Sequence, residues 1–255
     1  MEGYFVNKGS IVRKIWGKAD TVLFIFAGAA AEFALNKAVD WLYFTGRLPA
    51  DPLGRLFSTV IYARQIIFSE REEAENAIDK ITAIHTGVEK SRGEKIPDWA
   101  YRDVLFLLID YSIRSFELLE RKLTYNEESE IFDVFYRVGT RMELKDLPAN
   151  FTLWKQSREK HLNDDLIKSR FTTNLYRQYK IILGKPRYII LTQVQMILVP
   201  EKVKRMLDLG NTAWIIPLLH IYKLLRGLKL EKPFKSSLLP KVYKVQINAL
   251  DHSET

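Results

Sequence analysis

One stretch of the sequence, IPDWAYRDVLFLLIDYSIRSFELLERK at residues 96–122, most constrains what this chain can fold into. Read as a helix, its middle is apolar on nearly every side. Such a helix is stable only when other elements surround it, because each exposed side would leave apolar surface in water. The stretch therefore predicts a central, buried helix inside a larger assembly.

Helix start and stop signals recur along the chain, whereas the alternation typical of strands is scarce. These signals are an N-cap followed by proline, two capping boxes and two C-terminal glycines: Asp51–Pro52, Ser69–Glu72, Thr124–Glu127, Gly139 and Gly184. Together they predict an all-α fold in one domain over residues 1–255. Residues 201–255 are expected to form a basic, helical C-terminal portion, in which Pro217 should bend a helix.

The most membrane-like segment is TVLFIFAGAAAEFALNKAV at residues 21–39. It carries Glu32 and Lys37, and its uncharged run is shorter than the roughly 20 residues that a transmembrane helix requires. Basic residues precede it, as in a signal peptide, but Asp20 interrupts that pattern. We expect a buried helix that continues toward Trp41, in a cytoplasmic protein.

The absence of cysteine excludes disulfides, thiolate zinc sites, iron–sulfur clusters and cysteine nucleophiles. A metal site must therefore use carboxylates, a cofactor or the four histidines. No Glu-x-x-His pair occurs, which argues against a ferritin-like di-iron site.

Charge is unevenly distributed along the chain. Residues 1–150 hold 20 Lys and Arg against 23 Asp and Glu, whereas residues 151–255 hold 19 against 8. This basic C-terminal third predicts peripheral contact with an anionic membrane surface, with a merely solvated basic face as the alternative. No nucleic-acid-binding motif is present, so nucleic acid is not an expected partner.

His85 lies in an apolar stripe with helical spacing, together with Ala74, Ile78, Ile81 and Val88. A histidine on such a face needs its ring nitrogens satisfied by a hydrogen bond or by a metal. The residues alone leave both readings open: a core histidine bonded to a neighbour, or a metal ligand.

The preceding predicted helix has a narrow polar edge that includes Arg55, Ser58 and Thr59. Arg55 and Thr59 are one turn apart and point the same way. A guanidinium beside a hydroxyl is suited to hold a carboxylate or phosphate group. The alternative is an edge that simply faces water.

These segments resemble, in order, the family of MpaB-type oxygenases and latex-clearing proteins (rubber oxygenases). The likeness covers roughly residues 20–200 and rests on four stretches: GRLFST at 54–59, YARQIIFSEREEAENAIDKITAIHTGV at 62–88, Tyr101 in WAYRD, and LPANFTLWKQSREKHL at 147–162. The resemblance implies an all-helical core like that of latex-clearing protein, holding a b-type haem.

By the same resemblance, His85 corresponds to the axial haem ligand, and Arg55 and Thr59 to the residues beside the haem, next to Ser58. The implied activity is a haem-dependent oxygenase that uses dioxygen on an apolar, isoprenoid- or lipid-like substrate. The alternative is a non-catalytic helical protein that binds a fatty acid or isoprenoid without iron and uses Arg55 to hold its head group.

Three positions depart from the family pattern. Ser58 stands where rubber-cleaving members carry a lysine that caps the iron, and Ser69 and Lys90 stand where glycine is common. The family's glutamate base lies upstream of the arginine, where this chain offers Asp40 or Glu32. Rubber cleavage itself is therefore not expected.

For three further sets of residues we expect a structural role rather than a catalytic one. Asp110 and Arg114 are expected to form an internal ion pair on the central helix. His161, in the polar context SREKHLNDD, is expected to be exposed, and His220, in IIPLLHIYKLL, to be a core histidine with a hydrogen-bond partner.

Overall fold

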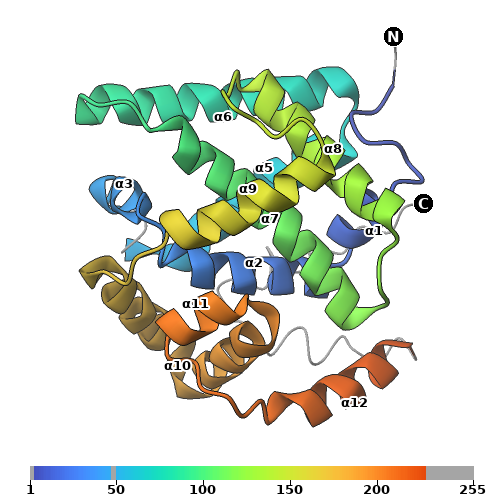
Figure 1. Ribbon diagram of the computed structural model, residues 1–255, viewed down its shortest axis with the longest axis vertical. Helices are drawn as coiled ribbons and strands as arrows, with labels where there is room; N and C mark the ends of the chain where they lie inside the picture. Colours follow the sequence, from blue (N-terminus) through green and yellow to red (C-terminus); the bar gives the residue numbers. More distant parts are fainter. Residues whose placement is uncertain (1–2, 47–49, 228–255) are drawn as a thin grey trace.

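The apolar stretch at 96–122 contains the central helix of the structure, a computed structural model that describes residues 3–46 and 50–227 (Figure 1). Within these residues the chain forms no strand, only two isolated bridges, and has eleven helices: α1 (Ile11–Trp16), α2 (Ala19–Phe33), α3 (Val39–Phe44), α5 (Pro52–Phe68), α6 (Arg71–Arg92), α7 (Asp98–Leu119), α8 (Tyr125–Arg141), α9 (Phe151–Asp164), α10 (Arg170–Leu198), α11 (Glu201–Met206) and α12 (Ile215–Gly227). The predicted all-α fold is confirmed.

Helix α7 is buried along most of its length, and every side chain from Leu105 to Ile113 is buried. It packs against α2, α8 and α10 and passes through the middle of the molecule (Figure 1). The prediction of a central, buried helix is therefore confirmed.

Helices α2 and α7 approach each other closely at Gly28. A Cβ atom on Gly28 would lie 2.2 Å from the Tyr111 ring, well inside van der Waals contact. Tyr111 itself is fully buried, so its ring has no free space into which it could move. Glycine is thus required here by packing rather than by backbone conformation.

Helix α2 is buried as predicted, but it ends at Phe33 instead of continuing toward Trp41. The Asn36 side chain accepts a hydrogen bond from the Ala38 N–H at 2.8 Å, and this local turn competes with the helical hydrogen bonds. The chain then restarts as the short helix α3. Among the described residues, none of the helices has the length and apolarity to cross a membrane.

Helices α5 and α6 pack against each other and carry the predicted site. Asp51 caps α5 by accepting from the Gly54 N–H at 2.8 Å, as predicted. The capping box predicted at Ser69 is wrong, because α6 begins only at Arg71. The N-terminal segment instead holds the chain at the start of α6. The Arg71 N–H donates to the Gly3 carbonyl, and Glu70 forms an isolated β-bridge with Tyr4.

Three helix start or stop signals were predicted in the second half of the chain, and the structure confirms only some of them. The capping box of Thr124 and Glu127 is confirmed. Gly139 does not end α8, which runs to Arg141. This glycine instead lets the helix pack closely, because a Cβ there would meet Leu105 at 2.7 Å. Gly184, with a φ of 71°, divides α10 at a kink, in agreement with its predicted role.

The C-terminal portion is described only as far as Gly227, so residues 228–255 lie outside the described part. Pro217 was expected to bend a helix, but it lies in the first turn of α12, where proline is tolerated. Most large apolar side chains of α12 are exposed, and only Ile215 is buried.

Candidate functional site

Three polar side chains come together on one edge of α5. Arg55 Nη1 lies 3.2 Å from Ser58 Oγ and 3.1 Å from Thr59 Oγ1, and donates to both. The two hydroxyls in turn donate back to the Arg55 carbonyl. All three side chains are half-buried, so the arginine is held in place at the boundary between the core and solvent.

On α6, the predicted apolar stripe becomes less buried along the helix. Ala74 and Ile78 are fully buried, whereas Ile81, His85 and Val88 are half-buried. The His85 ring meets Tyr101 edge to face, with ring centroids 5.0 Å apart. Its Nδ1 atom is buried and has no hydrogen-bond partner. A buried ring nitrogen without a partner is uncommon and needs a physical explanation.

The electrostatic environment keeps this imidazole neutral. Burial, followed by the positive charge of Arg55, lowers the pKa of His85 to about 4, while Glu89 acts in the opposite direction. The ring therefore carries a lone pair at neutral pH. Arg55 is thus close enough for its charge to act on the His85 ring.

The chemistry of these side chains suits a bound haem. A neutral imidazole nitrogen is the donor that haem iron takes from histidine. The nearby guanidinium and hydroxyls of Arg55, Ser58 and Thr59 suit an anionic group such as a carboxylate. The same arrangement suits a fatty acid head group, so the second predicted use of this site is chemically consistent too.

Glu89 was not singled out from the sequence, yet it ties α6 to α7 beside His85. Its Oε1 accepts from the Ile96 N–H at 2.9 Å and from the Tyr101 hydroxyl at 3.2 Å. Burial, and then Glu89, raises the pKa of Tyr101, so this phenol stays protonated. Glu89 thereby fixes the ring that packs on His85.

The two acids proposed as a base are in different environments. Asp40 is half-buried on α3 and pairs with Arg92 at 2.7 Å, in a hollow that Tyr43 and Phe171 also line. Arg92 belongs to α6, two turns beyond His85, so Asp40 lies on the side of that helix's C-terminal end. Glu32, in contrast, is fully buried in α2.

Glu32 is the centre of a buried ionic network. Both of its oxygens pair with Arg158 of α9, and Oε2 also accepts from the Tyr111 hydroxyl at 2.8 Å. Burial would raise the pKa of Glu32, but Arg158 and then His161 outweigh it and lower the pKa to about 2. A carboxylate held in this way is poorly suited to accept a proton from a substrate.

Arg158 extends the network to α7, where it lies 2.8 Å from Asp110 Oδ2. Asp110 also pairs with Arg114 at 2.9 Å, which confirms the ion pair predicted on α7. The network therefore links α2, α7 and α9 in the interior, in the region where these helices cross in Figure 1.

The prediction that His161 is exposed is wrong, because its ring is only 2% exposed. Its Nε2 lies 2.7 Å from Glu32 Oε1, and its Nδ1 lies 2.7 Å from Asp103 Oδ1. Burial alone would lower the pKa of His161, but the two carboxylates raise it to about 9. The spacing of Trp154, Arg158 and His161 was a sequence signal for one inward face of α9 that polar composition obscured.

The prediction for His220 is also wrong. It is exposed on α12, and its Nδ1 contacts only the Ile216 carbonyl of its own helix, at 2.8 Å. An apolar helix in a peripheral position exposes residues that its composition alone would place in a core.

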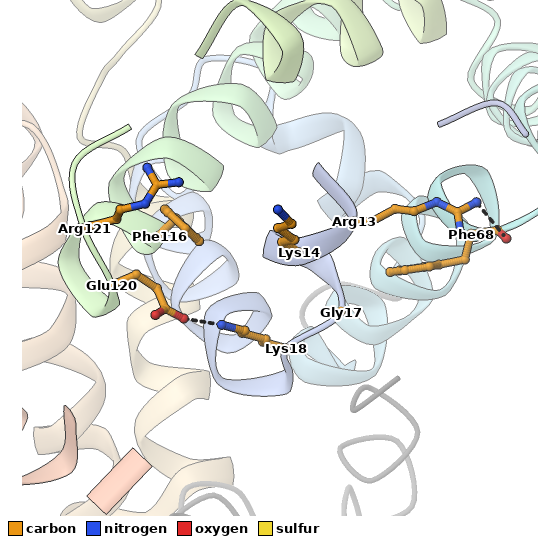
Figure 2. A pocket seen from close by; sticks show the side chains of 8 residues that line it. All are labelled: Arg13, Lys14, Gly17, Lys18, Phe68, Phe116, Glu120 and Arg121. Atoms are coloured by element: carbon orange, nitrogen blue, oxygen red, sulfur yellow. Dashed lines mark hydrogen bonds and ion pairs between the residues drawn. The ribbon is translucent and has the colours of Figure 1, made fainter. Parts of the chain in front are cut away.

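A second hollow lies at the far end of α5 (Figure 2). Its lining is mainly basic side chains around two aromatic rings: Arg13, Lys14, Gly17, Lys18, Phe68, Phe116, Glu120 and Arg121. Phe68 is the last residue of α5, so roughly 20 Å of helix separates this hollow from Arg55. It is not part of the site around His85.

A comparison against protein families gives a match over most of the chain. Residues 13–226 match the family model described as ER-bound oxygenase mpaB/B'/Rubber oxygenase, catalytic domain. The chain belongs to this family. No curated protein and no solved structure gives a match. Membership in this oxygenase family supports assignment of the chain to the oxidoreductases.

Proposed function

We propose that this member of the MpaB/rubber oxygenase family is a haem b-dependent oxygenase. It would use dioxygen on an apolar, isoprenoid- or lipid-like substrate. The observation that carries this proposal is the half-buried His85 imidazole, which stays neutral because its pKa is lowered to about 4 and so keeps a lone pair for iron.

Each residue of the site has a role in this proposal. His85 holds the iron, and Arg55, together with Thr59 and Ser58, orients a carboxylate of the haem or of the substrate. The haem, when bound, supplies the dioxygen chemistry. Tyr101 and Glu89 fix the orientation of the His85 ring. Because Ser58 replaces the family's lysine, this chain has no lysine at that position to cap the iron.

Asp40 is the better candidate for a base, because it is half-exposed and lies beside the hollow at the C-terminal end of α6. Glu32 instead stabilises the interior through Arg158 and Tyr111.

The experiment is to express the full chain with sufficient iron and haem precursor and to record its absorption spectrum. We expect a Soret band that His85→Ala reduces severalfold or abolishes. His220→Ala is the matched control, because His220 is exposed on α12, and it should leave the band unchanged. Colourless protein that also fails to bind added haemin would overturn the proposal.

The non-catalytic alternative makes a different prediction at Arg55. A protein that only binds fatty acids should remain colourless, copurify with lipid and lose fatty-acid affinity in Arg55→Ala. Native mass spectrometry without bound lipid, and unchanged affinity in this variant, would argue against the alternative and leave the haem proposal intact.

A further inference from the structure

Three side chains near the C-terminal end of α9 bring together atoms that could coordinate a metal ion. Asp103, His161 and Asp165 each offer one such atom, and these atoms lie within 4.8 Å of one another. We propose that these three residues bind a divalent transition-metal ion. This site is separate from the one around His85 and does not rest on the proposed haem function.

Asp103 on α7 has one oxygen arranged for this role. Its Oδ2 accepts a hydrogen bond from Asn36 Nδ2 at 2.7 Å, which fixes the carboxylate. Its Oδ1 is directed at the His161 ring, 2.7 Å from Nδ1. Metal-binding carboxylates are commonly held in this way, with one oxygen on the metal and the other hydrogen-bonded to the protein.

His161 supplies the second observation. Its Nδ1 is buried and makes no hydrogen bond, although Asp103 Oδ1 lies 2.7 Å away. On the other side of the ring, Nε2 lies 2.7 Å from Glu32 Oε1. A carboxylate that accepts from one ring nitrogen leaves the other nitrogen as a metal donor once the metal displaces its proton, as in carboxylate–histidine–metal sites.

Glu32 is well fixed for this supporting part. Arg158 binds both of its oxygens, and Tyr111 donates to Oε2. The imidazole orientation is therefore set by contacts from α2, α7 and α9, and the site is preorganised before any ion binds.

Asp165, directly after α9, completes the set and connects it to solvent. Its Oδ2 lies 3.7 Å from His161 Nδ1, and its side chain is 25% exposed. A metal ion could enter from this side and complete its coordination with water.

The donor atoms indicate the class of metal. One imidazole nitrogen with two carboxylate oxygens suits ions such as Zn²⁺, Mn²⁺, Fe²⁺ or Co²⁺. Ca²⁺ and Mg²⁺ prefer sites made only of oxygen donors. The ion would join α7 to the segment that links α9 and α10.

The test uses the full-length protein, stripped with a chelator and titrated with Co²⁺ at mildly alkaline pH. We expect one equivalent to bind, with visible absorption bands, and Zn²⁺ to displace it and raise the melting temperature. Asp165→Asn should weaken binding by about tenfold or more. Asp164→Asn, the same charge change one residue away at an exposed position, is the matched control and should bind normally.

Two results would overturn this inference. One is the absence of Co²⁺ binding to the stripped wild-type protein, and the other is an equal affinity in wild type and Asp165→Asn. Asp165 is partly exposed, so its variant should fold, which its circular dichroism and melting curve would verify. His85→Ala should keep its Co²⁺ affinity, so failure at one site is distinguishable from failure at the other.

Discussion

At the scale of single residues, the interior of this protein depends on how Glu32 is satisfied. A fully buried carboxylate costs free energy unless cations and hydrogen-bond donors surround it. Arg158 and His161 provide the charge, and the Tyr111 hydroxyl provides a further donor at 2.8 Å. The same Tyr111 ring packs on Gly28, so one side chain serves both the network and the contact between α2 and α7.

Tyr111→Phe removes this donor and leaves the ring in place. We expect the free energy of unfolding to fall by about 1–2 kcal/mol, because Glu32 loses a hydrogen bond that water cannot replace. Tyr125→Phe is the control, since the Tyr125 hydroxyl contacts Thr152 at 3.2 Å on the exposed surface. Urea denaturation measures both variants, and equal effects would contradict the buried role of Tyr111.

At the scale of helices, some local signals predicted the structure correctly, whereas long-range partners did not follow from them. The Asp51 cap and the Thr124 capping box lie within a few residues of the groups they bind, so the sequence contains the whole interaction. His161 depends on Glu32 and Asp103, which come from two other helices. Nothing in SREKHLNDD indicates that those carboxylates lie against it.

The same reasoning applies to the candidate site. Arg55 and Thr59 were paired from helix geometry, and the structure brings them together. That they lie with His85 beside a haem stays a prediction of the resemblance. The role of Glu89 could not be predicted, because its partners Ile96 and Tyr101 come next to it only after the chain reverses direction between α6 and α7.

Two of the glycines inside long helices, Gly28 and Gly87, should respond oppositely to alanine. Gly28→Ala places a methyl group against the buried Tyr111 ring and should destabilise the protein by about 1–3 kcal/mol. Gly87→Ala, in α6 with nothing within 4 Å, should stabilise it by about 0.5–1 kcal/mol through helix propensity. Thermal and urea unfolding measure both, and stabilisation by Gly28→Ala would contradict the close approach of α2 and α7.

The start of α8 predicts a dependence of stability on pH. Hydrogen bonds from Arg121 and then from the Thr124 N–H lower the pKa of Glu127 from 4.5 to about 2. A depressed carboxylate pKa stabilises the folded state above pH 4.5, and this contribution is lost as the pH falls toward 2. Glu127→Gln should therefore lose less stability than wild type over this range. Parallel urea curves at neutral and acidic pH measure the difference, and identical acid sensitivity would refute it.

At the scale of the whole molecule, α12 lies at the periphery and exposes an apolar face. Trp214, Leu218 and Ile221 recur at spacings of four and three, so they share one side, and about half of each side chain is exposed. A peripheral helix with an exposed tryptophan is typical of contact with a membrane surface. The basic C-terminal third would add attraction to anionic lipids.

If this face binds membranes, the protein should sediment with vesicles that contain phosphatidylserine. The double variant Leu218→Ser with Ile221→Ser should reduce the bound fraction severalfold, because it removes the apolar area that enters the interface. High salt should weaken binding as well, since the lipid charge is screened. Ile61→Ser changes an equally exposed apolar residue on α5 and should have no effect, and His85→Ala should bind as wild type does. If vesicle binding changes neither with salt nor in the double variant, the membrane prediction is wrong, and the basic third serves only to keep the protein soluble.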